Sequence, residues 1–399
     1  MAETVTEFPP GAAPDSVAAG LVVVDLTTSR RHRGQAPAGI VRTEREIGKA
    51  FLRRGGARFM FFDPALGFRA LPREEAEAVL YGRPGAEPAE TYEPAALRPG
   101  ETVLSPGLHW DSDALAALYR DKRRQGFRVC QVVYDMIPVL MPEFSLEGMA
   151  ERFSRFILDA LWTADAIFGI SECTNAALAA YAREVGAPLP PLHRLRLGCD
   201  IADAAPAVAP PIDVLRPGGF VLCVGTIEPR KNHILLYHLW RRLLAEHPDR
   251  LLPLVLVGTR GWNSDDFLRM LAMDGRLNPD WLAVMHGIDD AALGWLYRHC
   301  AFTLYPSLYE GWGLPVAESL GYGKRCIAAN AGGIPEAAQG CAELLDPLDF
   351  AAWYRAVLRL LEQREAAPAP FFRPLGWAAA MDEFCAKLTA APARPGAVG

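Results

Sequence analysis

The stretch Tyr305-Pro-Ser-Leu-Tyr-Glu-Gly-Trp-Gly-Leu-Pro-Val-Ala-Glu-Ser-Leu-Gly-Tyr-Gly323 follows directly on an apolar run, 301–305, that predicts a buried strand. It carries one carboxylate, Glu310, in a loop rich in glycine and proline, and a second, Glu318, on the helix expected next. Glycines give such a loop backbone freedom, and Pro315 suits the first turn of a helix. The stretch therefore predicts a strand end, free N–H groups and a helix N-terminus that together can bind an anion.

Two acids beside an anion site suit a ligand with both phosphates and hydroxyls, such as a nucleotide sugar. The alternative is a structural turn with one solvated glutamate. A second segment, Phe220-Val-Leu-Cys-Val-Gly-Thr-Ile-Glu-Pro-Arg-Lys-Asn232, predicts a buried strand, a turn at Gly225 and a basic pair that opens a helix. Lysine is rare in this arginine-rich chain, so Lys231 beside Arg230 at a strand end indicates an anion contact more than a solvated helix start.

The two segments resemble the Glu-x7-Glu signature and the basic pair of retaining glycosyltransferases of family 4, over about 220–347 and more thinly before that. The resemblance implies the GT-B fold, an α/β architecture of two Rossmann-like domains that face a central cleft. It also implies that Arg230 and Lys231 hold the donor diphosphate, that Glu318 holds the ribose hydroxyls and that Glu310 contacts the donor sugar near the reacting carbon.

The resemblance gives further donor contacts, mostly through the backbone. Met285-His-Gly-Ile-Asp289 is similar to the family segment whose backbone pairs with the base, and His286 is expected to be a structural residue at a strand end. The residues expected to bind the donor are Gly39, Gly225, Arg230, Lys231, Ile288, Gly311, Trp312, Gly313, Leu314 and Glu318.

The first half of the chain resembles the family at two places. Ala38-Gly39-Ile-Val-Arg42 is similar to the loop that opens the first helix at the cleft, where Arg42 is either a phosphate or acceptor contact or a surface charge. In Gln131-Val-Val-Tyr134-Asp135, the family's usual histidine is Tyr134, which can replace its hydrogen bond but not its protonation. Asp135 and Tyr134 complete the expected catalytic set with Glu310, Arg230 and Lys231.

No metal site is expected. Asp111-Ser-Asp113 has the spelling of a metal-binding Asp-x-Asp motif, but it precedes an amphipathic helix that Asp113 is suited to cap. In Gly332-Gly-Ile-Pro-Glu336 another helix is expected to open at the cleft, with Glu336 structural rather than catalytic.

The combination of Glu-Pro-Arg-Lys-Asn, Tyr-Asp-x-Ile-Pro and Gly-Ile-x-Arg-x-Glu resembles the bacterial capsule, O-antigen and exopolysaccharide branch, which is often mannosyltransferase-like. It implies a metal-independent hexosyltransferase without a cofactor, with GDP-mannose as the first expectation for the donor and a UDP-hexose as the second. The acceptor is expected to be a glycan or lipid-linked. Two alternatives stay open: a nucleotide-sugar epimerase of the same fold, and a weakly active nucleotide-sugar-binding subunit of a biosynthetic complex.

Composition narrows the class of protein. Half of the residues are hydrophobic and 22% are charged, which is typical of a globular protein, and the net charge of −6 argues against nucleic-acid binding. Neither a signal peptide nor a long apolar run is evident, so we expect a cytoplasmic protein. The cluster Arg30-Arg31-His32-Arg33 is either a solvated loop or a peripheral contact with phosphate or with anionic lipid at the inner face of the membrane.

Strands that alternate with helices predict parallel sheets with ligands at the carboxyl ends of the strands. A loop is expected at Thr27–Ala38, an irregular insertion at 63–100 and the last strand of the first sheet at Leu195–Leu197. The expected organisation is a loose N-terminus (1–18), an acceptor-side domain (19–201), a proline-rich linker (202–217), a nucleotide-sugar-binding domain (218–375), a crossover helix (376–390) and a tail (391–399).

Overall fold

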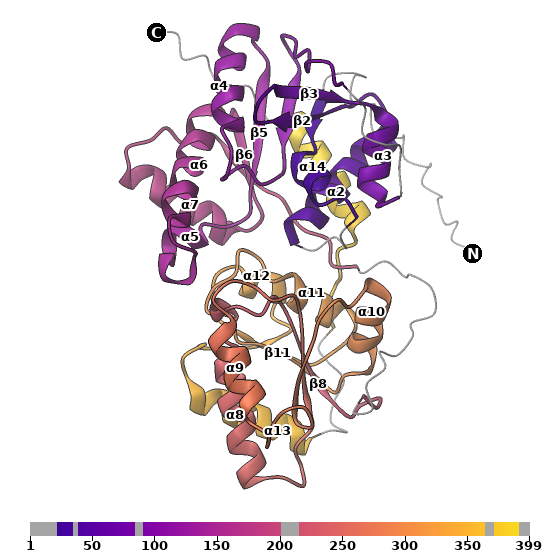
Figure 1. Cartoon of the computed structure of the whole chain (residues 1–399), viewed down its shortest axis with the longest axis vertical. Coiled ribbons are helices and arrows are strands. Elements are labelled where there is room, and N and C mark those ends of the chain that lie inside the picture. Colours follow the sequence, from indigo (N-terminus) through magenta and orange to yellow (C-terminus); the bar gives the residue numbers. More distant parts are fainter. Residues whose placement is uncertain (1–21, 35–38, 84–90, 201–214, 364–370, 391–399) are drawn as a thin grey trace, which may run out of the picture.

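The computed structural model describes residues 22–34, 39–83, 91–200, 215–363 and 371–390. The expected loose N-terminus, most of the expected linker and the expected tail lie outside these ranges, as does Ala38. The described residues form two α/β domains, each built on one sheet, which stand one above the other (Figure 1). Among these residues, no helix is both long and apolar enough to cross a membrane.

The described part of the first domain contains a seven-stranded sheet in the order β3-β2-β1-β4-β5-β6-β7. All neighbours are parallel except β2 and β3, which form an antiparallel edge. The strands are β1 (Val22–Asp25), β2 (Arg58–Asp63), β3 (Gly67–Leu71), β4 (Thr102–Ser105), β5 (Arg128–Val133), β6 (Ala166–Gly169) and β7 (Leu192–Arg194).

Three expectations for this domain were wrong. Part of the expected loop at Thr27–Ala38 is a short helix, and the expected irregular insertion at 63–100 contains β3 and a helix. The last strand lies three residues before Leu195–Leu197. The helices are α1 (Thr27–Arg31), α2 (Gly39–Arg54), α3 (Arg73–Tyr81), α4 (Ala114–Gln125), α5 (Ile137–Leu140), α6 (Met149–Thr163) and α7 (Glu172–Glu184), with a 3-10 turn at Pro142–Phe144.

The described part of the second domain contains a six-stranded parallel sheet in the order β10-β9-β8-β11-β12-β13. Its inner strands are continuous apolar runs, as expected of parallel strands with both faces covered. The strands are β8 (Val221–Val224), β9 (Leu254–Val257), β10 (Leu282–Met285), β11 (Thr303–Tyr305), β12 (Cys326–Ala329) and β13 (Glu343–Leu345).

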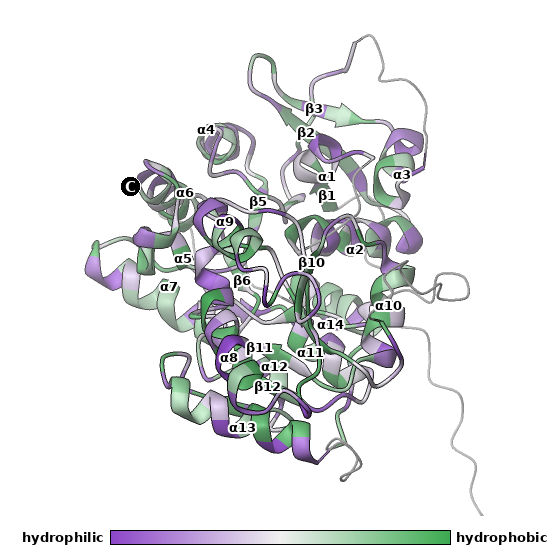
Figure 2. Ribbon diagram, turned by 60° about the horizontal axis from the view of Figure 1, so that its bottom comes forward, coloured by the Kyte–Doolittle hydropathy of each residue, from purple (hydrophilic) through white to green (hydrophobic). Residues whose placement is uncertain are grey.

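Helices cover this second sheet. One of them, α13, has a period typical of an amphipathic helix, and the bands of both colours on it in Figure 2 show its mixed hydropathy. It buries Trp353, Ala356, Val357, Leu360 and Leu361. The helices are α8 (His233–Glu246), α9 (Asp265–Met273), α10 (Asp290–His299), α11 (Leu314–Gly321), α12 (Ile334–Ala338) and α13 (Phe350–Glu362), with a 3-10 turn at Pro229–Lys231.

The last described helix, α14 (Trp377–Ala390), returns to the first domain and packs against α2 (Figure 1). Its Phe384 ring meets the edge of Phe168 on β6, with the ring centres 5.0 Å apart. The Lys387 ammonium donates to the carbonyl of Arg194 at 3.0 Å. The end of the described chain therefore ties the second domain to the first.

In each sheet the chain first builds outward on one side and then returns to the other side of its first strand. The first sheet reverses between β1 and β4, and the second between β8 and β11. At such a point the loops after two neighbouring strands diverge, which leaves a crevice at the carboxyl ends of the strands. In the second sheet, the loops that border this crevice are those after β8 and β11.

Candidate active site

The loops after β8 and β11 meet at this reversal point. After β8, the chain turns at Gly225 and enters the 3-10 turn Pro229–Lys231. The backbone carbonyl of Arg230 accepts from the N–H of Leu308 at 2.8 Å, and Nη1 of Arg230 donates to the carbonyl of Tyr309 at 2.5 Å. These two bonds bring the basic pair beside the loop that carries Glu310.

The Glu310 carboxylate joins both members of the basic pair. Its Oε1 accepts from Nζ of Lys231 at 2.5 Å, and its Oε2 lies 3.0 Å from Nη1 of Arg230. Burial alone raises the pKa of Glu310, but the positive charges of Arg230 and Lys231 outweigh it and lower the pKa to about 2. Glu310 is therefore ionised throughout the physiological range.

A second carboxylate, Glu228, holds the other side of Arg230. Its Oε1 lies 2.5 Å from Nη2 of Arg230, and its side chain is almost fully buried. Burial lowers the pKa of Arg230, but the charges of Glu310 and Glu228 outweigh it and raise the pKa. No role was expected of Glu228 from the sequence, although it stands directly before Pro229 in the segment that carries the basic pair.

Asp135 reaches this cluster from the first domain. It follows β5, and its Oδ1 accepts from the N–H of Ile137 at 2.9 Å. Burial raises its pKa, and the nearby charge of Arg230 opposes the rise. A Cβ atom placed on Gly311 would lie 3.0 Å from Cβ of Asp135 and 2.2 Å from the carbonyl oxygen of Tyr134. Gly311 thus permits a close approach of the two domains that no larger residue allows.

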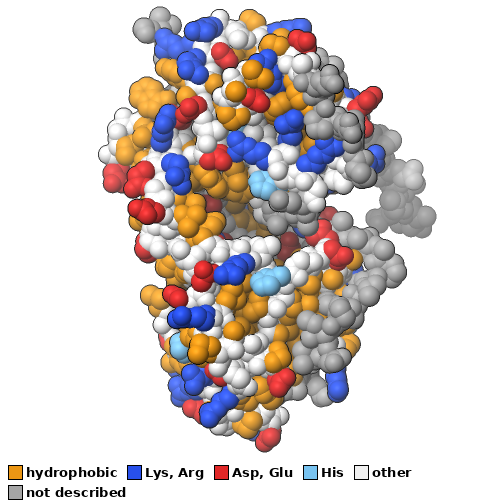
Figure 3. Space-filling view, viewed as in Figure 1, with side chains coloured by type: hydrophobic (Ala, Val, Ile, Leu, Met, Phe, Trp, Pro, Cys, Tyr) orange, Lys and Arg blue, Asp and Glu red, His pale blue; other side chains and the backbone are white. Residues whose placement is uncertain are grey.

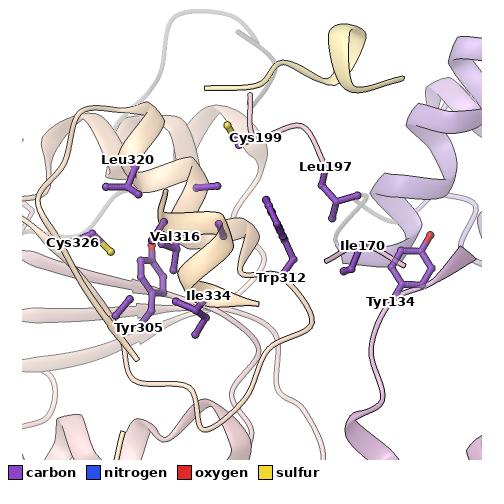
Figure 4. Packing of buried hydrophobic residues seen from close by; sticks show 14 of the residues in the cluster. Tyr134, Ile170, Leu197, Cys199, Tyr305, Trp312, Val316, Leu320, Cys326 and Ile334 are labelled. Carbon is purple, nitrogen blue, oxygen red and sulfur yellow. The ribbon is translucent and has the colours of Figure 1, made fainter. Parts of the chain in front are cut away.

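The side chain of Tyr134 bonds within its own domain. Its hydroxyl donates to the carbonyl of Pro106 at 2.5 Å within the first domain. Figure 4 shows this hydroxyl pointing away from Trp312 of the second domain. Burial raises the pKa of Tyr134 well above its usual value, so the phenol stays neutral. The structure therefore brings the Tyr134 backbone, rather than its hydroxyl, to the loop of Glu310.

Glu318 lies on α11, buried, where the sequence predicted a helix. Its Oε2 accepts from the hydroxyl of Tyr297 at 3.0 Å, and Tyr297 in turn lies 3.4 Å from the hydroxyl of Tyr305. Burial raises the pKa of Glu318, and the charge of Arg42 opposes the rise. The two tyrosines, which the sequence analysis did not single out, orient this carboxylate.

Arg42 crosses from the first domain to the second. Its Nη2 lies 2.6 Å from Oδ1 of Asp290, the first residue of α10. The expected base contact, Ile288, packs near this helix with the hydrophobic residues around Met285. His286 lies with Nδ1 2.5 Å from the carbonyl of Gly258, which fits the structural role expected of it. Arg42 therefore lies toward the expected nucleoside end of the site.

Three of the expected backbone contacts are glycines at a turn or at the start of a helix. A Cβ on Gly225 would lie 3.7 Å from the Lys231 side chain. Gly313 has a φ of 110° and precedes Leu314, where α11 begins without a side-chain cap. Gly39 begins α2 with a φ of 49°. Glycine tolerates both positive φ values without strain.

Trp312 and Glu336 connect the domains. The Trp312 side chain is buried in the hydrophobic cluster that joins the two cores, and Figure 4 places it between Ile334 and Leu197. Glu336, at the start of α12, accepts from the N–H groups of Glu172 at 3.0 Å and Cys173 at 2.9 Å. This carboxylate caps α7 of the other domain, in accord with the structural role predicted for it.

The residues of the Asp-x-Asp motif lie in ion pairs. Asp111 bonds to Arg31 at 3.0 Å, and Asp113 bonds to Arg155 at 3.1 Å. Asp113 occupies the N-cap position of α4, as predicted, but its side chain forms no capping hydrogen bond there. Within the ranges that the structure describes, no three His, Cys, Asp or Glu side chains are arranged to hold a metal ion.

A buried polar cluster at the reversal point of the first sheet was missed by the sequence analysis. Oδ2 of Asp25 lies 2.6 Å from Nε2 of His109, and both side chains are fully buried. Glu44 accepts from the N–H of Ser29 at 2.6 Å, while its Oε2 finds no partner among the described residues. Burial, with a contribution from Asp25, raises the pKa of Glu44 to about 7.

The site lies where the two domains face each other. Figure 3 shows the surface hollowed between the upper and lower domains. On the first domain, a small cavity lies beside Asp135. Its lining is largely apolar and includes Ile40, Leu108, Trp110, Phe153 and Phe156.

Comparison with known proteins supports the resemblance to glycosyltransferases that the sequence motifs indicate. Residues 216–369 match the family described as "Glycosyl transferases group 1". The O-antigen chain mannosyltransferase B of Escherichia coli is 28% identical over 250 residues, which are 61% of this chain and 64% of that protein. The serotype-specific mannosyltransferase WbdA of Escherichia coli is 25% identical over 315 residues, which are 75% of this chain and 36% of that protein. The match thus spans less than two thirds of each of these relatives.

Solved structures share the whole two-domain architecture. Sucrose-phosphate synthase of Thermosynechococcus elongatus superimposes with a TM-score of 0.58 at 18% identity, over 93% of this chain and 94% of that chain. HepE of Anabaena, solved in complex with UDP and glucose, gives a TM-score of 0.58 at 14% identity, again over 93% and 94%. The predicted fold is thereby confirmed: the chain has the GT-B fold, and most of its second domain matches the group 1 glycosyl transferases.

Proposed function

We propose that the protein is a retaining hexosyltransferase that moves mannose from GDP-mannose to a glycan or lipid-linked acceptor in the synthesis of a bacterial polysaccharide. The observation that carries this proposal is the convergence of Arg230, Lys231 and Glu310 at the reversal point of the second sheet. The mannosyltransferases among the relatives support the choice of sugar. A UDP-hexose is the second candidate donor.

Breaking the glycosyl–phosphate bond leaves positive charge on the anomeric carbon and adds negative charge to the departing diphosphate. Arg230, Lys231 and the uncapped N-terminus of α11 can stabilise that negative charge. The loss of one such donor typically costs about 3–4 kcal/mol of activation free energy. We assign the sugar end to Glu310, the ribose to Glu318 and the acceptor side to Asp135.

The first experiment is a thermal-shift panel of GDP, UDP, ADP and TDP, because a ligand at about 100 times its Kd adds roughly 2.7 kcal/mol of stability. We expect GDP to give the largest shift, and Glu318→Ala to reduce it. Release of GDP from GDP-mannose in the presence of mannoside acceptors then tests turnover. Binding without turnover would favour the nucleotide-sugar-binding subunit, an alternative that the inward-turned hydroxyl of Tyr134 keeps open.

A further inference from the structure

The basic pair already has carboxylate partners on the protein. Lys231 bonds to Glu310, while Arg230 bonds to Glu310, to Glu228 and to the carbonyl of Tyr309. Two cations and two carboxylates have a formal charge that sums to zero. A diphosphate that binds the same cations therefore meets Glu310 both as a competitor for their hydrogen bonds and as a nearby like charge.

Protonation cannot relieve this competition at neutral pH, because the two cations keep the carboxylate ionised. The backbone of Glu310 is also held in place. Its carbonyl accepts from the N–H of Gly333 at 2.8 Å, and a Cβ on Gly332 would lie 2.2 Å from the same oxygen. A departure of the carboxylate from the cations is therefore a rotation of its side chain, away from the two cations and from the hydroxyl of Ser307, rather than a movement of the loop.

Arg230 stays anchored after such a rotation. Glu228 holds Nη2, and the carbonyl of Tyr309 holds Nη1. The rotation frees the hydrogen bonds that Lys231 and Arg230 give to Glu310, and it leaves the guanidinium where it is. Glu228 and Tyr309 thus fix the position of the Arg230 guanidinium. Glu310 determines whether the donors that bond to it are available to a diphosphate.

We propose that Glu310 is a specificity-determining residue that distinguishes the complete nucleotide sugar from the nucleoside diphosphate alone. The inference rests on the proposed function, which puts a diphosphate on Arg230 and Lys231. With a complete donor, the displaced carboxylate accepts from sugar hydroxyls in place of its two cations. With the diphosphate alone it has no such partner, so it returns to the cations and favours release of the product after transfer.

The test is calorimetric titration of GDP, and separately of UDP, into the parent and into Glu310→Gln. We expect Glu310→Gln to bind the preferred nucleoside diphosphate about 10- to 100-fold more tightly, because a competitor with charge-assisted hydrogen bonds has been removed. The gain for the matching nucleotide sugar is smaller, because the variant also loses bonds to the sugar. The affinity ratio of nucleotide sugar to nucleoside diphosphate therefore falls in the variant.

Glu343→Gln is the matched control, since it removes one carboxylate from the same domain in an exposed ion pair with Arg359. It should leave both affinities within about twofold, as expected for a distant surface charge. In a Lys231→Met background, the gain in nucleoside diphosphate affinity from Glu310→Gln should shrink, because one of the two cations for which Glu310 and the diphosphate compete is missing. Should Glu310→Gln fail to fold, Glu310→Asp, whose side chain is too short to bond both cations, should show a smaller gain in GDP affinity.

Equal or weaker binding of the diphosphate by folded Glu310→Gln or Glu310→Asp overturns the inference and leaves the proposed function intact if the parent still transfers sugar. If neither parent nor variant binds any nucleoside diphosphate or nucleotide sugar, the proposed function fails as well. The inference is also overturned if Glu343→Gln raises the affinity for the nucleoside diphosphate as much as Glu310→Gln does. The gain would then come from the change in net charge.

Discussion

The ammonium of Lys231 lies 2.5 Å from a carboxylate oxygen of Glu310, although 79 residues separate the two in the sequence. The pair is formed because one residue follows β8 and the other follows β11, and these strands are neighbours in the sheet. The parallel topology, rather than proximity along the chain, therefore assembles the centre of the candidate site.

Gly311→Ala tests the close approach of the domains. The added methyl group would meet the carbonyl of Tyr134, which as backbone cannot rotate aside. We expect a loss of about 1–3 kcal/mol in the free energy of unfolding, as is typical of overpacking. Displacement of the Glu310 loop should also reduce turnover about 100-fold.

The control for this substitution is Gly275→Ala, because a Cβ at Gly275 has no atom within 4 Å. Its turnover and stability should match the parent in the same assays. If Gly311→Ala behaves like Gly275→Ala, the two loops do not pack as closely in solution as in this structure.

Tyr134→Phe tests whether the tyrosine replaces the family's histidine. Its hydroxyl bonds to the buried carbonyl of Pro106, so its removal should cost about 1–3 kcal/mol in urea unfolding. Turnover of the folded variant should stay within a few-fold of the parent. A large loss of turnover with normal stability would instead place the hydroxyl on the donor sugar.

The buried Glu44 predicts a pH dependence of stability. Its pKa is raised from 4.5 to about 7, so between these values the folded state holds more protons than the unfolded state. The free energy of unfolding should therefore fall as the pH rises through this window, by up to about 3 kcal/mol from this group. Urea titrations of the parent and Glu44→Gln from pH 4 to 8 measure the difference.

His109 contributes with the same sign. Burial lowers its pKa, but Asp25 outweighs burial and raises it, so its stabilising effect is present below pH 6.5 and lost as the pH rises further. Because the charge of Glu44 helps to raise the pKa of His109, the difference between the two titrations reports Glu44 together with its effect on His109. Parallel curves for parent and variant would show that Glu44 ionises in the folded state as readily as in the unfolded chain.

Turnover is expected without a divalent metal, because Arg230, Lys231 and the N-terminus of α11 can meet the charge of the diphosphate. Activity in excess EDTA should stay within a few-fold of activity in magnesium or manganese. Asp111→Asn and Asp113→Asn should likewise leave turnover within a few-fold of the parent, since both carboxylates form ion pairs with arginines. Loss of turnover in EDTA with recovery on metal addition would refute this assignment.

The fold was predictable where strands are continuous apolar runs, as in Val221–Val224 and Leu254–Val257. It was not predictable at Gly67–Leu71, a half-buried edge strand that contains glycine and arginine and lies in a segment rich in proline. The strand Leu192–Arg194 has three half-buried residues and a weak pattern, and the more apolar Leu195–Leu197 next to it was predicted instead. The helical period of Phe350–Glu362 was present in the sequence and was overlooked.

The residues that form the site could be predicted from the sequence, but the contacts that their side chains make could not. Strand ends and motif spacing placed Arg230, Lys231 and Glu310 in one site, because carboxyl ends of neighbouring parallel strands meet. Nothing in the sequence indicated that Arg42 pairs with Asp290, 248 residues away. The direction of the Tyr134 hydroxyl depends on packing with Pro106 in another loop, which no local pattern encodes.

The most direct test of the account is hexose transfer by purified protein from GDP-mannose, with UDP-glucose in parallel, to synthetic mannoside acceptors with and without a lipid anchor. Mass spectrometry and NMR of the product measure the added hexose and its anomeric configuration. We predict a mannosylated product with retained configuration from the parent, and almost none from Glu310→Gln. Nucleotide binding without any glycosylated product, or full activity in Glu310→Gln, would contradict the central claim that Glu310, Arg230 and Lys231 form the centre of a glycosyltransferase.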